Sequence, residues 1–221
     1  LRDGSLNFSR NDWSFGGGAT AFNLMHIYKG ASYDSDEIFS DIHTQAGKGW
    51  KTNFHQYLAG NNQNASYVDA SGKAHFFDIS NGKIYDTSGL GLFLETVASC
   101  KKLSDVNGNE MHFSPQGKLC CISSALGNDL FIGYEASGLN NLSNVNASDI
   151  GDSLANTRIA YIQNGNYKAT FSYQNDLLSS ISYTGSEHSA DEVLKFTYID
   201  GRLTKIHKEA QVNGSTVESI Q

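Results

Sequence analysis

The stretch Phe196-Thr-Tyr-Ile-Asp-Gly-Arg-Leu-Thr-Lys-Ile206 predicts the fold of this chain, because the sequence repeats it with small changes. An earlier copy is Phe171-Ser-Tyr-Gln-Asn-Asp-Leu-Leu-Ser-Ser-Ile181, and a third, one residue shorter, is Phe113-Ser-Pro-Gln-Gly-Lys-Leu-Cys-Cys-Ile122. Each copy joins an aromatic strand end to an aliphatic strand start through a turn of Asp, Asn or Gly. A repeated hairpin of this kind is typical of arrays, which serve as scaffolds more often than as single-site enzymes.

The composition agrees with a folded β protein. The chain has 221 residues, 39% of them hydrophobic, and includes 12 Phe and 11 Tyr, which argues against disorder. Gly and Asn, which favour tight hairpin turns, are abundant, whereas Pro occurs once. The net charge of -7 is spread along the chain without a basic stripe, so we expect no nucleic-acid partner.

The alternation of apolar and polar residues predicts an all-β fold, an antiparallel meander of successive β-hairpins that forms a curved sheet. Residues 1–100 are expected to form an N-terminal β region that precedes the repeats. Residues 101–221 are expected to hold the repeat hairpins, interrupted by a polar loop at 135–156, with the whole forming one continuous sheet. Residues 50–58 are expected to form one strand, and a short helical turn is expected near 35–40.

The repeats at 171–181 and 196–206 resemble the YD repeats of Rhs-family and wall-associated bacterial proteins. The stretch Gly47-Lys-Gly-Trp50 is similar to the segment before the repeats in Gram-positive members of that family. The same holds for Tyr67-Val-Asp-Ala-Ser-Gly-Lys-Ala-His-Phe-Phe77 and for Tyr85-Asp-Thr-Ser-Gly-Leu-Gly-Leu92. The resemblance extends over most of the chain, from about residue 6 to 208.

The resemblance implies the start of a YD-repeat β-shell, a long sheet that spirals around or displays a variable C-terminal effector, often a toxin. It implies a secreted parent protein at the cell surface or in the cell wall, and a non-enzymatic scaffold role for this part. The partners would be the following repeats and the C-terminal domain of the parent protein. No catalytic residue is carried over, and no cofactor is implied.

The alternative function is a carbohydrate-binding β module that recognises cell-wall polysaccharide. Exposed Trp side chains can stack on sugar rings, which makes Trp13 and Trp50 the candidate ligand-binding residues. Core packing is the other interpretation of both. Core packing is favoured for Trp50, which starts an alternating strand. For Trp13, core packing and ligand binding are expected equally.

Enzyme and metal motifs are mostly rejected. Gly151-Asp-Ser-Leu154 spells the nucleophile block of GDSL-type esterases, but polar residues precede it and no Asp is followed by His three residues later. None of the seven His forms a His-x₃-His pair or a zincin motif, so no metal site is expected. His75 and His112, each one residue before a Phe, are expected on polar strand faces.

The cysteines and the strand edges lead to two further expectations. Cys100, Cys120 and Cys121 are expected to be free apolar strand residues, with one bridge from Cys100 to either of the others as the alternative. The chain is interpreted as a piece of a longer protein. Because the missing repeats would otherwise cover its strand edges, we expect self-association through a terminal strand.

Overall fold

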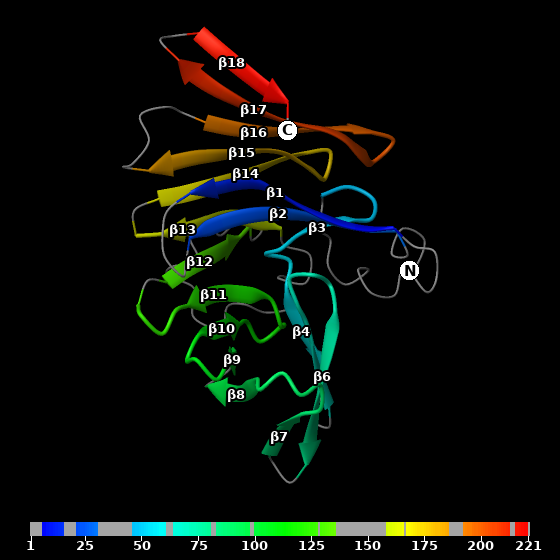
Figure 1. Ribbon diagram of the computed structural model, residues 1–221, viewed down its shortest axis with the longest axis vertical. Helices are drawn as coiled ribbons and strands as arrows, with labels where there is room; N and C mark the ends of the chain where they lie inside the picture. Colours follow the sequence, from blue (N-terminus) through cyan, green and yellow to red (C-terminus); the bar gives the residue numbers. More distant parts are fainter. Residues whose placement is uncertain are drawn as a thin grey trace.

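The chain forms antiparallel β-sheets, as Figure 1 shows for the computed structural model. The structure describes residues 6–15, 21–30, 46–60, 64–80, 83–97, 100–127, 129–135, 158–165, 167–185, 192–212 and 215–220. Within these ranges there is no α-helix, and so none that could cross a membrane. The predicted all-β antiparallel meander is confirmed.

The first seven strands make two small sheets. The three-stranded sheet consists of β1 (Asn7–Phe15), β2 (Phe22–Lys29) and β3 (Trp50–Thr52). The four-stranded sheet consists of β4 (Tyr57–Gly60), β5 (Asn64–Val68), β6 (Ala74–Ser80) and β7 (Lys83–Asp86).

The remaining strands form one eleven-stranded sheet, in which every strand pairs only with its neighbours in sequence. Its strands are β8 (Phe93–Val97), β9 (Cys100–Ser104), β10 (Glu110–Phe113), β11 (Leu119–Ser123), β12 (Asp129–Tyr134), β13 (Ile159–Asn164), β14 (Tyr167–Gln174), β15 (Leu177–Gly185), β16 (Glu192–Ile199), β17 (Arg202–Val212) and β18 (Ser215–Ile220). The large sheet therefore begins at residue 93, and the strands before it do not continue it.

The repeated phrase has one geometry in the large sheet. Phe171 pairs with Ile181 and Phe196 with Ile206, and in both hairpins the register shifts just before the next aromatic residue. The third copy has the same shift, between His112 and Phe113. Such bulges bend and twist a sheet, so repeating one at the same place curves the array in one sense.

The structure also corrects the alignment of the third copy. Phe113 pairs with Leu119 directly after the bulge, which is the place of Tyr173 and Tyr198 in the other hairpins. The pair that corresponds to Phe171–Ile181 is Met111–Ile122. Aligning Phe113 with Phe171 and Phe196 is therefore wrong by two residues. The turn after Phe113, Ser114–Lys118, is longer than the turns of the other two copies, so the spacing from the aromatic residue to the second strand differs.

The two small sheets pack against the large one and close a single core. In Figure 1 the three-stranded sheet crosses the middle of the view, and it packs on the large sheet where Trp13 contacts Tyr183 on β15 and His26 contacts Phe196 on β16. In the lower part, the four-stranded sheet joins the large sheet through Tyr67, whose ring centroid lies 6.0 Å from that of Phe113. One cluster of buried residues includes members of all three sheets, and full burial of each large side chain contributes roughly 1.5–3 kcal/mol.

Several predicted elements differ from the structure. The expected strand 50–58 is two strands, β3 and β4, because residues 53–56 turn between two sheets. β7 pairs with β6 and β8 with β9, so residues 84–85 and 92–96 are not partners in one hairpin although they follow each other in sequence. β18 was not among the strands predicted from the sequence. The predicted helical turn at 35–40 and all but the first residue of the polar loop 135–156 lie outside the described residues.

Candidate functional site: an aromatic hollow beside Trp50

The Gly47-Lys-Gly-Trp50 stretch folds into a tight turn that leads into β3. Gly47 and Gly49 have φ angles of 97° and 78°, the left-handed conformation that glycine adopts at least cost. A Cβ on Gly49 would lie 2.7 Å from the ring of Tyr28, so glycine is also required for space. The amide of Lys48 donates to the carbonyl oxygen of Gly201 at 2.9 Å, which fixes this turn against the β16–β17 turn.

The turn places Trp50 in an aromatic group beside a hollow. Its ring centroid lies 5.2 Å from that of Tyr28 and 6.2 Å from that of Phe8, which meets it edge to face. Phe8 is 48% exposed and lies on β1. These three rings, together with Leu6, Gly30, Lys48, Arg202 and Leu203, line a hollow of about 600 Å³. Aromatic surface that remains exposed around a concavity is typical of a binding site.

Charged side chains lie at the rim of this hollow. Lys48 and Arg202 are exposed residues that lie beside the apolar wall. A second hollow of about 320 Å³ also includes Phe8 and Tyr28 in its walls, with Lys29 and Lys73. The two hollows together form a surface with an aromatic centre and basic flanks, which suits a ligand with an extended apolar face and negative or hydroxyl groups.

The structure separates the two tryptophans that the sequence suggested. Trp13 is 6% exposed, packs edge to face on Phe22 and donates from Nε1 to Glu192 across the sheets at 3.2 Å. The register shift between Asn11 and Trp13 places Asp12 and Trp13 both inside, although neighbouring strand residues normally alternate. Trp13 is thus a core residue, whereas Trp50 lines the hollow.

Three buried histidines have local structural partners. His26 Nδ1 lies 2.5 Å from Asp12, His75 Nε2 lies 2.7 Å from Asp69, and His55 Nδ1 accepts from the amide of Thr52 at 3.2 Å. In the described part of the chain, the second ring nitrogen of each has no hydrogen-bond partner, and His55 Nδ1 also lies 2.8 Å from the hydroxyl oxygen of Thr52. His75 is buried, which corrects the expectation that it lies on a polar strand face.

Lys51 is buried between the two small sheets. Its Nζ donates to the carbonyl oxygens of Asp69 at 2.8 Å and of His55 at 3.3 Å. Burial lowers the pKa of Lys51 to about 7, opposed by the charge of Asp69. Through these contacts Lys51 holds β3 against the turn between β5 and β6, so its role is structural.

The three cysteines are free thiols, as the leading expectation had it. Burial raises the pKa of Cys120 to about 12 and raises that of Cys121, so both remain protonated and unreactive at neutral pH. The alternative bridge from Cys100 is not formed.

The sequence suggested Trp50 as a candidate ligand-binding residue, with core packing as the favoured interpretation, and it did not identify its neighbours at the hollow, Phe8, Tyr28, Lys48 and Arg202. These residues come from β1, β2, the turn before β3 and the start of β17, so only the packing of two sheets brings them together. The one usable signal was the Gly-Lys-Gly stretch before Trp50, because such glycines mark a close approach of the backbone to another group.

The chain matches no established protein family and no curated protein by sequence. The fold, however, is similar to a solved structure, the N-terminal domain of effector protein SpvB from Salmonella typhimurium strain LT2. The two share 10% sequence identity with a TM-score of 0.52, over 90% of this chain and 98% of that one. This likeness shows that the arrangement of sheets occurs in a bacterial effector protein, and it does not test the resemblance to YD repeats.

Proposed function

We propose that this chain is a non-enzymatic scaffold, the first part of a YD-repeat-like β-shell in a secreted bacterial surface protein. The observation that supports the proposal is the eleven-stranded meander, in which each hairpin pairs with the next and repeats the same bulge. A sheet built in this way is extended by adding hairpins, without any change to those already present.

The outer edge of β18 is where further hairpins would add. Among the described residues, β18 pairs with β17 alone, so the backbone groups on its other side are open to another strand. In this proposal the partners are the following repeats and the C-terminal effector of the parent protein, which is displayed at the cell surface or in the cell wall.

Hydrogen–deuterium exchange tests the scaffold role. The β18 amides that point away from β17 should exchange quickly in the isolated chain at concentrations where it is monomeric, and slowly in the parent protein, where a following strand covers them. The amides of Phe171 and Ile181, in the middle of the sheet, serve as the control and should be protected in both. Equal exchange of the β18 amides in the two proteins would contradict the proposal.

A second candidate function is the binding of a cell-wall polysaccharide in the aromatic hollow. The observation that favours it is the group of Trp50, Tyr28 and Phe8 at a concave surface with Lys48 and Arg202 at its rim. Aromatic faces pack on the apolar faces of sugar rings, and the basic side chains suit the anionic groups of wall polymers.

Binding to isolated cell walls and to a glycan panel separates this function from the pure scaffold. Phe8→Ala removes exposed ring surface and should weaken binding at least fivefold without unfolding the chain. Phe76→Ala is the matched control, since Phe76 on β6 is 58% exposed but lines neither hollow. Binding that is absent, or that is equal in both variants, leaves the scaffold as the function.

A further inference from the structure

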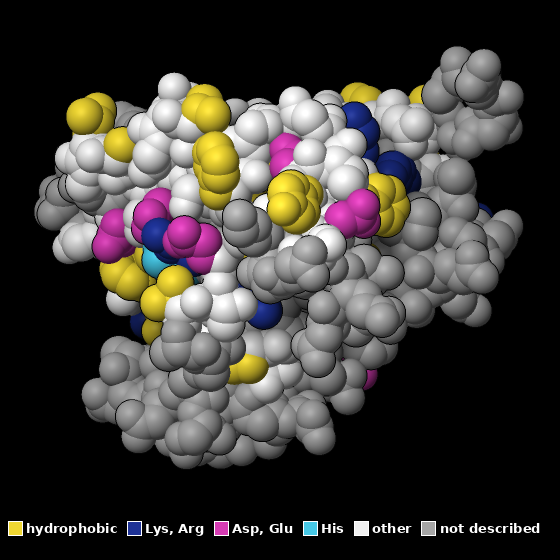
Figure 2. Space-filling view, turned by 90° about the horizontal axis from the view of Figure 1, so that it is seen from below, with side chains coloured by type: hydrophobic (Ala, Val, Ile, Leu, Met, Phe, Trp, Pro, Cys, Tyr) yellow, Lys and Arg dark blue, Asp and Glu magenta, His cyan; other side chains and the backbone are white. Residues whose placement is uncertain are grey.

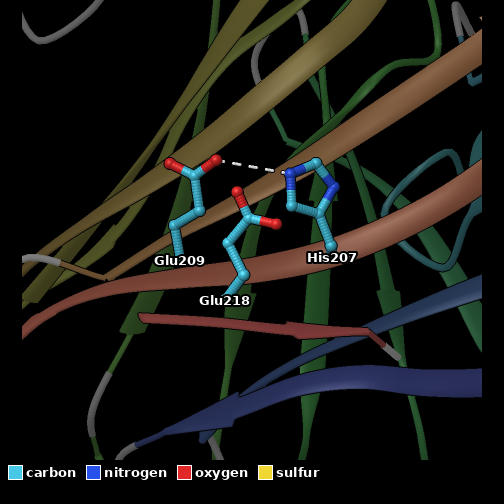
Figure 3. A group of neighbouring side chains, drawn as sticks. All are labelled: His207, Glu209 and Glu218. Carbon is cyan, nitrogen blue, oxygen red and sulfur yellow. Dashed lines mark hydrogen bonds and ion pairs between the residues drawn. The ribbon is translucent and has the colours of Figure 1, made fainter. Parts of the chain in front are cut away.

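Three side chains with metal-ligating atoms meet on the last two strands of the large sheet. His207 and Glu209 lie two residues apart on β17 and therefore share one face of the strand. Glu218 on β18 pairs directly with Glu209. One ligand atom from each of the three lies within 4.8 Å of the others. Figure 3 shows the two carboxylates side by side, with the imidazole of His207 next to them.

The charges in this group are not balanced within the described structure. Two carboxylates directly opposite each other on neighbouring strands repel. Lys195 contacts the Oε2 atom of Glu209 at 2.7 Å, and Oε1 faces His207 Nε2 at 3.3 Å. Within the described ranges, Glu218 has neither an ion pair nor a hydrogen bond. The oxygen atoms that face His207 are thus without a cation between them.

A similar group on β8–β10 shows how the sheet balances such charges elsewhere. There Lys102 lies between two carboxylates, 3.2 Å from Glu95 and 3.0 Å from Glu110, and His112 Nε2 lies 3.2 Å from Glu110. His112 pairs across the strands with Lys102 just as His207 pairs with Lys195. The difference is that Lys102 bridges both acids, whereas in the described part of the chain Lys195 contacts Glu209 and not Glu218.

We propose that His207, Glu209 and Glu218 bind a divalent transition-metal ion such as Zn²⁺. One imidazole nitrogen and two carboxylate oxygens are a ligand set that Zn²⁺ accepts, with water in the remaining position. The imidazole disfavours Ca²⁺ and Mg²⁺, which take oxygen ligands. The His207 side chain is 12% exposed, so packing holds it in place. Glu218 is exposed, so its side chain can move toward the bound ion.

The ion would connect β17 to β18 through side chains and so fix the outermost hairpin of the sheet. Within the described residues, β18 pairs with no strand other than β17. A sequence search for His-x₃-His pairs does not find such a site, because residues on one strand face lie two apart and the third ligand comes from the next strand.

The experiment is a titration of the untagged, metal-free chain with Zn²⁺ by calorimetry and with Co²⁺ by absorption. We expect one ion per chain and no thiolate charge-transfer band, which excludes binding by the free cysteines. Glu218→Gln and His207→Gln should each weaken binding at least tenfold and abolish the rise in Tm that Zn²⁺ causes. Lys195→Gln should tighten binding, because it removes a competing positive charge beside Glu209.

Glu110→Gln and His112→Gln in the similar β10 group are the matched controls and should bind as the unaltered chain does. The proposal is overturned if no saturable binding occurs, if Glu218→Gln and His207→Gln bind as tightly as the unaltered chain, or if the Co²⁺ spectrum shows thiolate ligands. It is also overturned if the β10 variants lose binding to the same extent.

Discussion

The hydroxyl of Tyr173 donates a hydrogen bond of 2.7 Å to the carbonyl oxygen of Ile159 on the neighbouring strand. Tyr134 makes the corresponding bond to Leu119 at 2.8 Å. Tyr198 occupies the same place after the bulge of the last repeat, but its hydroxyl is buried without a partner among the described residues. Among the described residues, the hydroxyls of Tyr134 and Tyr173 therefore each have a hydrogen-bond partner, whereas that of Tyr198 has none.

Substitution of these tyrosines by Phe should change the free energy of unfolding differently at Tyr198 than at Tyr134 and Tyr173. Tyr134→Phe and Tyr173→Phe should each lower the free energy of unfolding by about 1 kcal/mol, because each removes one net hydrogen bond. Tyr198→Phe should leave it unchanged or raise it by up to about 1 kcal/mol, since an unpaired buried hydroxyl is removed. Urea denaturation of the three variants measures this. An equal loss in all three would mean that Tyr198 has a partner.

The two-residue turns of the repeats give a second prediction. Asn175 and Asp176 have φ angles of 51° and 59°, and Asp200 and Gly201 have 51° and 75°, as in type I′ hairpin turns. Asp176→Gly should stabilise the chain by about 0.5–1 kcal/mol, because glycine adopts this conformation more readily. Gly201→Asp should destabilise it by a similar amount.

A steric clash does not explain the destabilisation expected for Gly201→Asp, since a Cβ on Gly201 would lie at an ordinary 3.4 Å from the side chain of Lys48. Thermal unfolding of the two single variants and of the double variant is the measurement. The double variant should lie close to the unaltered chain. Changes of the same sign in both single variants would contradict the backbone explanation.

Acid should destabilise the fold through His55. Burial, with the charges of Lys51, Lys118 and His26, lowers the pKa of His55 to about 3 from an ordinary 6.5. The unfolded chain therefore binds a proton that the folded chain does not between about pH 6.5 and 3, so stability falls as the pH falls through this window. Between pH 7 and pH 4 the loss from this group is roughly 3 kcal/mol.

A comparison with His55→Asn isolates this effect from that of the carboxylates. The variant is less stable at pH 7, because it loses packing, but its stability should change less between pH 7 and pH 4. His112→Asn, at a half-exposed histidine, should keep the full pH dependence. If His55→Asn also keeps it, the acid sensitivity comes from other groups.

Self-association through β18 is the fourth prediction. The open edge of β18 and the exposed side chain of Val217 allow a second copy to pair with it. Light scattering during size-exclusion chromatography should show a dimer that dissociates on dilution. Val217→Lys should weaken the dimer, because edge lysines block strand pairing. A monomer at all concentrations would contradict this prediction.

Among the described strands, β8 is the other edge of the large sheet, and it provides the control for that experiment. On the face of the molecule shown in Figure 2, seen from the β7–β8 end, several exposed hydrophobic side chains are separated by polar atoms and do not form one patch. Val97→Lys on β8 should therefore leave the dimer unchanged. Loss of the dimer in this variant would move the interface to β8.

Much of the large sheet could be predicted from the sequence, because hairpin formation is local. The Asp200-Gly201 turn and the flanking alternation specify β16 and β17 without reference to distant residues. β18 could have been found in the same way from Asn213-Gly214, a dipeptide typical of hairpins. The alignment of Phe113 with the other two aromatic residues failed, because the third hairpin has a longer turn and a pattern of residue types does not show turn length.

The sequence by itself determined the class of fold, the turns and the pairing of neighbouring strands, since each depends on residues close together in the chain. Only the tertiary structure decided that the first strands leave the large sheet and cover it, because that depends on which apolar faces meet. The same packing buries Trp13, leaves Trp50 at a hollow, and brings Phe8, Lys48 and Arg202 beside it. Contacts between residues this far apart in sequence depend on the summed burial of three sheets, which no local pattern encodes.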